Sequence, residues 1–261
     1  MLNLKFYRLL NLSILKNTIL KTNIQMDIAP KDSVDLRGLR VSFDNKDALK
    51  DFAIKDPLKL FDHWFNIARN TDSIIEPNAM AIATATKSGK PSVRYLLLKS
   101  YGEDGFSFFS NYESRKGKEI AENPQVALLF YWNTLCRQIR IEGTVVKLSE
   151  KESEDYFHQR PRSSQLSALA SRQSEVIESK DVVERKKEEL ENKYPEGTSK
   201  LPKPDYWGGY KVIPESFEFW CGRNDRFHDR MRFRKLSDKE KADEKLIHTG
   251  ENGWIYEYLS P

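Results

Sequence analysis

The segment from Trp220 to Arg230, WCGRNDRFHDR, concentrates side chains that could take part in chemistry. If the backbone is extended over residues 226–230, Arg226, His228 and Arg230 lie on one face, because side chains alternate along a strand. These cations repel one another and suit an anionic or electron-rich ligand better than a protein core. A flat, electron-rich cofactor together with an acidic substrate would provide that environment. Asp229 points to the other face, where we expect it to pair with a neighbouring cation.

A second candidate site lies at Ser114-Arg115-Lys116, where a helix is predicted to begin. Two cations in the first turn oppose the helix dipole, which favours anions at that end. The arrangement is explained if an anion such as phosphate binds the free backbone N–H groups and the two side chains complete the site. Two solvated bases on a surface helix are the simpler alternative.

A third candidate site combines a phenol, a guanidinium and a hydroxyl. Tyr156 and Arg160 are four residues apart on a predicted helix, so they share a face. Pro161 is expected to end that helix and to leave Ser164 in the loop that follows. Three such groups around one point suit a phosphate, and an amphipathic helix end with a solvent-reaching arginine explains the pattern equally well.

The strand predicted at residues 92–101 carries a cation near each end of an apolar run. Alternation places Arg94, Leu96 and Leu98 on one face and Tyr95, Leu97 and Lys99 on the other. Such a strand could serve two ligands on opposite sides. A barrel strand whose charges reach solvent is the competing interpretation, and the pattern alone favours it.

A mainly β framework is predicted to position these residues. A helix should begin at Asp56-Pro57, an N-cap followed by proline, and bury the positions at helical spacing between Leu60 and Ala68. Further helices are predicted at 114–123 and from the capping box at Ser149 to about Pro161, and the Lys- and Glu-rich segment 178–194 should be a solvated helix. Short strands are predicted at 79–86, 92–101, 105–110, 126–132, 137–148, 210–220, 229–236 and 254–259.

This order of elements indicates an antiparallel barrel with helical excursions. The βαβ alternation of a doubly wound fold is missing, and so are the GxGxxG and GxxxxGKS/T phosphate loops. A bound phosphate would therefore have to be held by side chains and a helix end.

The charge of the chain argues against a general nucleic-acid binder. The net charge of +4 comes from 43 basic and 39 acidic residues, and residues 1–26 hold four bases and no acid. The remainder is therefore neutral, whereas nucleic-acid binding needs a basic face. The two cysteines form no CxxC pair and the four histidines are scattered, so we expect no disulfide framework, no metal site and a reducing compartment such as the cytoplasm.

The N-terminal part of the chain divides into two segments before a domain at 55–261. Residues 1–26 are apolar and basic, which fits either a mitochondrial targeting segment or a disordered extension before an alternative start at Met26. Residues 27–54 are polar and irregular and are predicted to form an arm. No run of 18 apolar residues exists, so no membrane span is expected.

In this order, the candidate sites resemble those of the pyridoxamine 5'-phosphate oxidase (pyridoxine 5'-phosphate oxidase) family. The resemblance runs from about Asp56 to Pro261, and nine motifs in the same order exceed what chance would produce. The motifs are RYLLLK at 94–99, NYESRKGKEIAENP at 111–124, FYW at 130–132, RQIRIEG at 137–143, YFHQRPRSSQ at 156–165, SRQS at 171–174, PDYWGGY at 204–210, EFW at 218–220 and RFHDR at 226–230.

The resemblance implies a split β-barrel homodimer with FMN at the subunit interface. The FMN-binding positions that it implies are Arg94, Tyr95, Leu96, Leu97, Phe109, Ser110, Arg115, Lys116, Gln138, Gln173, Ser174, Trp220 and Arg230. It implies that Lys99, Tyr156, Arg160 and Ser164 hold the phosphate of the vitamin and that Arg40 of the arm contacts the substrate. Arg226 and His228 would lie over the ring of the substrate as the catalytic residues.

The activity that the resemblance implies is oxidation of pyridoxamine 5'-phosphate or pyridoxine 5'-phosphate by O2 to pyridoxal 5'-phosphate, with release of H2O2. The implied hydride passes from C4' to the flavin, so the protein mainly orients two rings. Asp225 stands where the family usually has Asn and could weaken Arg226 by pairing with it, and Phe43 replaces a usual Tyr in the arm. Two alternatives are a split-barrel flavoprotein with another substrate and a non-catalytic carrier of pyridoxal 5'-phosphate, and each would lack one of the two residue sets.

Overall fold

The computed structural model describes residues 38–39, 51–197 and 200–261. The chain divides into two units, Met1–Val41 and Ser42–Pro261, and every helix and strand discussed below belongs to the second. The expected targeting segment, most of the expected arm, and the positions Arg40 and Phe43 lie outside the described residues.

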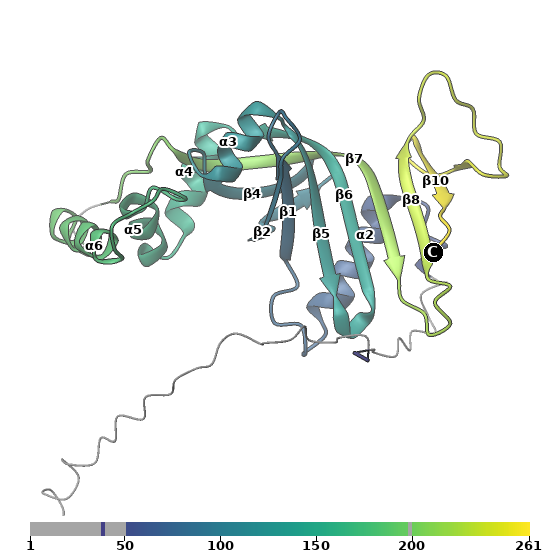
Figure 1. Ribbon diagram of the computed structural model, residues 1–261, viewed down its shortest axis with the longest axis horizontal. Coiled ribbons are helices and arrows are strands. Elements are labelled where there is room, and N and C mark those ends of the chain that lie inside the picture. Colours follow the sequence, from purple (N-terminus) through teal and green to yellow (C-terminus); the bar gives the residue numbers. More distant parts are fainter. Residues whose placement is uncertain (1–37, 40–50, 198–199) are drawn as a thin grey trace, which may run out of the picture. The chain divides into compact units, whose positions relative to one another are not determined.

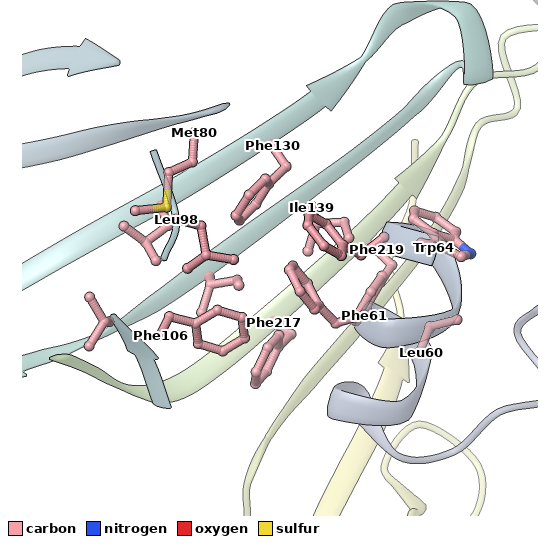
Figure 2. Packing of buried hydrophobic residues seen from close by; sticks show 14 of the residues in the cluster. Leu60, Phe61, Trp64, Met80, Leu98, Phe106, Phe130, Ile139, Phe217 and Phe219 are labelled. Carbon is pink, nitrogen blue, oxygen red and sulfur yellow. The ribbon is translucent and has the colours of Figure 1, made fainter. Parts of the chain in front are cut away.

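The first described helix, α2 (Pro57–Arg69), begins as the sequence predicts. The Asp56 carboxylate accepts hydrogen bonds from the backbone N–H groups of Leu58 and Lys59 at 2.8 and 2.9 Å, and proline occupies the first helical position. The face that carries Leu60, Phe61 and Trp64 is fully buried. Figure 2 shows these side chains packed against strand residues such as Phe217 and Phe219.

One antiparallel sheet forms the body of the described chain. Its main path has the order β2-β1-β5-β6-β7-β8-β10-β9, and β4 joins it by pairing with β7 and β3. The strands are β1 (Ala79–Ala85), β2 (Pro91–Leu97), β3 (Ser100–Gly102), β4 (Gly105–Asn111), β5 (Gln125–Trp132), β6 (Arg137–Lys147), β7 (Trp207–Cys221), β8 (Asp229–Lys235), β9 (His248–Thr249) and β10 (Trp254–Tyr258). The predicted mainly β fold with helical excursions is therefore confirmed (Figure 1).

The longest strand, β7, has 15 residues and connects two parts of the sheet (Figure 1). Its first half pairs with β4 in a register that sets Ser110 opposite Gly208, and its second half pairs with β8 in a register that sets Trp220 opposite Arg230. The contour from Trp207 to Trp220 is about 40 Å, since a strand rises about 3.3 Å per residue.

The helices α3 (Arg115–Glu122), α4 (Glu150–Gln159), α5 (Arg162–Ala170) and α6 (Asp181–Lys193) are excursions from the sheet. The capping box at the start of α4 has both of its hydrogen bonds, between Ser149 and Glu152. No residue of α6 is buried, as expected of a solvated helix.

Three local predictions were wrong. The strand expected at 92–101 is two strands, because β2 ends at Leu97 and Leu98 turns its side chain into the core before β3 begins. Ser164 lies in the first turn of α5 and not in a loop, because Pro161 ends one helix and also starts the next. Arg226 is not extended: its φ of 65° places it in a turn, and β8 begins only at Asp229.

Candidate functional site

The side chain of Lys116 is the centre of a buried polar cluster. Its Nζ donates hydrogen bonds to Ser110 Oγ at 2.9 Å, Ser114 Oγ at 3.1 Å and Gln173 Oε1 at 2.7 Å. Ser114 caps α3 by accepting from the N–H of Gly117, which fixes the first turn of the helix. The structure thus brings together Ser110, Lys116 and Gln173, three of the positions that the sequence indicated for FMN.

Lys116 lacks an anionic partner in this cluster. Only 5% of the residue is exposed, and burial together with the neighbouring Arg94 lowers the pKa of its ammonium group to about 8. Among the described residues, no carboxylate lies within ion-pair distance of Lys116. A buried cation without a counter-ion is costly, so this donor set fits a phosphate group such as that of FMN.

Glu119 organises the two arginines of this region. Its Oε2 accepts hydrogen bonds from Thr84 Oγ1 and Ser92 Oγ, both at 2.5 Å, and its Oε1 accepts from Arg115 Nε at 2.9 Å. Arg94 donates to the same two hydroxyls at 2.6 and 2.5 Å, and its NH2 lies 3.6 Å from the carboxylate. Burial opposes ionisation of Glu119, but these donors outweigh it and hold its pKa at about 2.

A second set of predicted cofactor residues forms a row across three strands. Gln138 on β6 lies opposite Trp220 on β7, which lies opposite Arg230 on β8. The His228 ring lies 4.8 Å from the Trp220 ring. Arg230 is fixed by Glu218, whose Oε1 lies 2.7 Å from its NH2.

The turn before β8 differs from the sequence-based expectation. Asp225 pairs with Arg223 at 2.9 Å and accepts from the N–H of Phe227 at 3.0 Å, so it is not the partner of Arg226. Asp229 pairs with a neighbouring cation as predicted, because its Oδ1 lies 3.5 Å from Arg223. His228 accepts at Nδ1 from the N–H of Arg223 at 3.0 Å, which in the neutral ring assigns the proton to Nε2.

The third candidate site includes three stacked aromatic rings, those of Phe109, Tyr156 and Trp207, which we call the aromatic platform. Tyr156 stacks on Phe109 with ring centroids 4.0 Å apart, and the Arg160 guanidinium lies 4.7 Å from the centroid of the Trp207 ring. Burial lowers the pKa of Arg160, and its NH1 is buried without a hydrogen-bond partner. An anion would satisfy this donor.

Lys99 lies between β2 and β3. Its N–H donates to the Ser107 carbonyl at 2.9 Å, and its side chain lines a cavity of about 480 Å³ together with Arg69 and Tyr101. Across 51–197 and 200–261, no hydrogen bond or ion pair joins Lys99 to Tyr156, Arg160 or Ser164.

The predicted site residues fall at two ends of β7. The Lys116 cluster lies next to the start of β7, because Ser110 pairs with Gly208. The aromatic platform lies there too, because Trp207 is the first residue of β7. The row of Gln138, Trp220 and Arg230 lies about 40 Å further along the strand. The predicted site residues of one chain therefore form two separate groups.

Comparison with known proteins identifies the family. A family model described as "Pyridoxamine 5'-phosphate oxidase" matches residues 69–194, and one described as "Pyridoxine 5'-phosphate oxidase C-terminal dimerisation region" matches 207–261. The pyridoxine/pyridoxamine 5'-phosphate oxidase of Bombyx mori is 48% identical over 232 residues, which are 88% of this chain and 90% of that protein. The pyridoxine-5'-phosphate oxidase of Bos taurus is 50% identical over 207 residues, 79% of this chain and 78% of that protein.

The chain belongs to the pyridoxine/pyridoxamine 5'-phosphate oxidase family.

Two solved structures support the fold. PhzG from Burkholderia lata 383, in complex with tetrahydrophenazine-1-carboxylic acid, is 28% identical and superposes with a TM-score of 0.72 over 85% of this chain and 100% of that one. A pyridoxamine 5'-phosphate oxidase-related, FMN-binding protein from Nostoc punctiforme PCC 73102 is 14% identical and has a TM-score of 0.57 over 79% of this chain and 98% of that one, which bears on the fold alone. The predicted split barrel is thus confirmed, with the dimerisation region of the family at its C-terminal end.

Sequence reasoning missed two residues that organise this family member's sites. Glu119 follows Arg115 by four residues, a spacing that allows an ion pair on a helix and could have indicated it. Trp207 stands in the PDYWGGY motif but has no charge, and only the fold places it under Arg160. Within the described part of the chain, no group of three His, Cys, Asp or Glu side chains is placed to hold a metal ion, and no helix is long and apolar enough to cross a membrane.

Proposed function

We propose that this chain oxidises pyridoxamine 5'-phosphate and pyridoxine 5'-phosphate with O2, giving pyridoxal 5'-phosphate and H2O2, with FMN as cofactor. Relatives that match most of this chain are named pyridoxine/pyridoxamine 5'-phosphate oxidase and pyridoxine-5'-phosphate oxidase. One structural observation supports it most directly. Two separate cations, the buried Lys116 and the half-buried Arg160, have no carboxylate partner among the described residues, and the reaction needs two bound phosphates. One phosphate belongs to the cofactor and the other to the vitamin.

We assign Arg94, Arg115, Lys116, Ser110 and Gln173 to the FMN phosphate. The flavin ring would be held by the row of Gln138, Trp220 and Arg230 and by further positions named from the motifs, which are Tyr95, Leu96, Leu97, Phe109 and Ser174. When bound, FMN supplies the redox chemistry, accepting a hydride and returning the electrons to dioxygen.

We assign the phosphate of the vitamin to Tyr156, Arg160, Ser164 and Lys99, with Arg40 as a further contact from the arm. Arg226 and His228 are the proposed catalytic residues, because the His228 ring lies against Trp220 and Arg226 belongs to the same turn. His228 presents an N–H at Nε2 and can hold or move a proton at the substrate, and Arg226 can orient its polar groups.

The C-terminal dimerisation region indicates a homodimer. Since the two groups of predicted site residues in one chain lie at opposite ends of β7, we propose that each complete site combines the phosphate sites of one subunit with the Trp220 row of its partner. Val93, Tyr95 and Tyr131 are more than half exposed, which is consistent with a covering partner.

The remaining assignments concern the ends of the chain and the compartment. We propose 55–261 as the oxidase domain, 27–54 as an arm over the substrate, and 1–26 as a targeting or disordered extension. The cytoplasm is the proposed compartment, or the mitochondrion if residues 1–26 direct the chain there.

Purification followed by a flavin assay tests the proposal. We expect a yellow protein that releases peroxide under air with pyridoxamine 5'-phosphate, with pyridoxine 5'-phosphate, or with both. A colourless protein that does not bind added FMN would overturn the proposal. A yellow protein inactive on both substrates would retain the flavin assignment and reject the substrate.

A further inference from the structure

The carboxylate of Glu119 lies in the middle of the proposed phosphate site of the cofactor, where a negative charge opposes an anionic ligand. It is 95% buried as a side chain and remains ionised over the whole useful pH range, because its pKa is about 2. A buried acid in such a place requires an explanation, since its own field disfavours phosphate.

The hydrogen bonds of Glu119 give that explanation. Thr84 and Ser92 each have one hydroxyl proton, and both protons are donated to Glu119. The oxygens of these hydroxyls therefore turn their lone pairs to Arg94, which donates one N–H to each. The carboxylate thus fixes Arg94 through two hydroxyls as well as by direct attraction at 3.6 Å.

Arg115 is held in a different way. Only its Nε is bonded to Glu119, and 55% of its side chain is exposed. Its two terminal nitrogens therefore remain available to a ligand. Without Glu119, this long side chain would sample many rotamers, and its charge would avoid Arg94 and Lys116.

The charges of the cluster match one ligand class. Arg94, Arg115 and Lys116 are three cations, and Glu119 reduces their net charge to +2. A phosphate monoester carries a charge close to −2 above its second pKa of about 6. The cluster therefore balances a terminal phosphate group.

We infer that Glu119 is a positioning residue for the flavin phosphate, which orients Arg94 and Arg115 and balances the cluster to the charge of a phosphate monoester dianion. This inference rests on the proposed function, because it takes the FMN phosphate to bind at Arg94, Arg115 and Lys116.

Two effects of removing the carboxylate have opposite signs. Loss of its field would strengthen phosphate binding, whereas loss of orientation and greater repulsion among the cations would weaken it. The second effect dominates here, because the repulsion acts on Lys116, whose pKa of about 8 leaves little margin before it loses its charge.

The test compares the binding of FMN and riboflavin to the flavin-free protein by quenching of flavin fluorescence. Glu119→Gln keeps the shape of the side chain and removes its charge. We expect FMN binding to weaken about 10- to 100-fold, the range for losing hydrogen bonds to charged groups, and riboflavin binding to change less than twofold. Glu122→Gln is the matched control, because it removes the same charge from an exposed position of the same helix and should leave both affinities unchanged.

The pH dependence gives a readout that a purely structural role would not move. The charged group that acts on the Lys116 ammonium is Arg94 from β2, and Gln173 from the loop after α5 accepts a hydrogen bond from it. Arg115 and Glu119 belong to the same helix as Lys116 and pair with each other, as do Glu113 and Arg172. Because the pKa of Lys116 is lowered to about 8, the wild type must take up a proton to bind phosphate above that pH, so FMN affinity should fall by up to tenfold per pH unit there. In Glu119→Gln this fall should begin at lower pH.

The outcomes separate the inference from the proposed function. If Glu119→Gln binds FMN as tightly as the wild type or more tightly, with an unchanged pH profile, the positioning role is wrong and the FMN site stands. If Lys116→Ala binds FMN like the wild type, the phosphate site itself is misplaced. If Glu119→Gln does not fold, Ser92→Ala removes one hydroxyl link, and equal losses of FMN and riboflavin affinity in that variant would also overturn the inference.

Discussion

At the scale of single residues, the turn from Arg223 to His228 decides which side chains can reach a substrate. His228 is oriented by a backbone N–H at its Nδ1, and Asp225 is occupied by Arg223 and by the N–H of Phe227. The acid that stands beside Arg226 in the sequence therefore does not neutralise it in the structure. This arrangement leads to two predictions with different expected outcomes.

Replacing both Arg226 and His228 with Ala should lower turnover by about 10²-fold or more, the usual range for losing acid–base assistance, while bound flavin stays at the wild-type level. Peroxide release under air and the flavin absorbance of the purified variant measure the two quantities. Turnover within a fewfold of the wild type would remove both residues from the chemistry.

Asp225→Asn should leave the substrate KM within about twofold of the wild type, because the lost partner is Arg223 at the exposed surface, where solvent screens the ion pair. Steady-state kinetics with either substrate test this expectation. A large decrease in KM would mean that Asp225 does compete for Arg226 in solution.

At the scale of elements, the close approach of β4, β7 and α4 depends on Gly208. A Cβ at this position would lie 2.0 Å from Tyr112 Oη and 2.9 Å from Ser153 Oγ, so a larger residue fits only if these side chains shift. Gly208 also lies opposite Ser110, which links the packing of the strands to the Lys116 cluster.

Gly208→Ala should therefore lower the free energy of unfolding by about 1–3 kcal/mol, as expected of overpacking. Denaturant unfolding of the flavin-free protein measures the change. Gly102→Ala is the control, because its Cβ would meet nothing closer than 3.4 Å, and it should change the free energy of unfolding by less than about 0.5 kcal/mol. Equal effects of the two substitutions would contradict the packing argument.

The elements also show what a sequence can predict and why. The starts of α2 and α4 were predictable because Asp56 and Ser149 bond to backbone groups two or three residues away. The break of the strand at Leu98 was not, because it depends on core contacts made by distant residues. Most proposed phosphate ligands could be named from motifs, but Glu119 acts through Thr84 and Ser92, which only the fold brings beside it.

At the scale of the whole molecule, the length of β7 separates the two groups of proposed site residues in one chain. Arg160 rests on Trp207 at the start of this strand, and His228 rests on Trp220 near its end. Pyridoxamine 5'-phosphate is much shorter than the contour of about 40 Å along β7 between these two tryptophans. Under the proposed assignments, the two residues would act on one substrate from different subunits of the homodimer.

This arrangement predicts complementation between two inactive variants. Arg160→Ala and the double variant Arg226→Ala, His228→Ala should each be nearly inactive alone. After equal amounts are unfolded and refolded together, half of the dimers are mixed, and each has one intact site and one doubly damaged site. We therefore expect about a quarter of wild-type activity by the peroxide assay, whereas activity no higher than that of the separate variants would place both residues on one subunit.

The span of β7 has a thermodynamic consequence for assembly. If each flavin contacts both subunits, the cofactor and the partner subunit are linked ligands, and each raises the affinity of the chain for the other by the same factor. A subunit that loses its flavin also loses part of the free energy that holds its partner. The supply of flavin would then govern how much of this protein exists as dimer, in addition to how much of it is active.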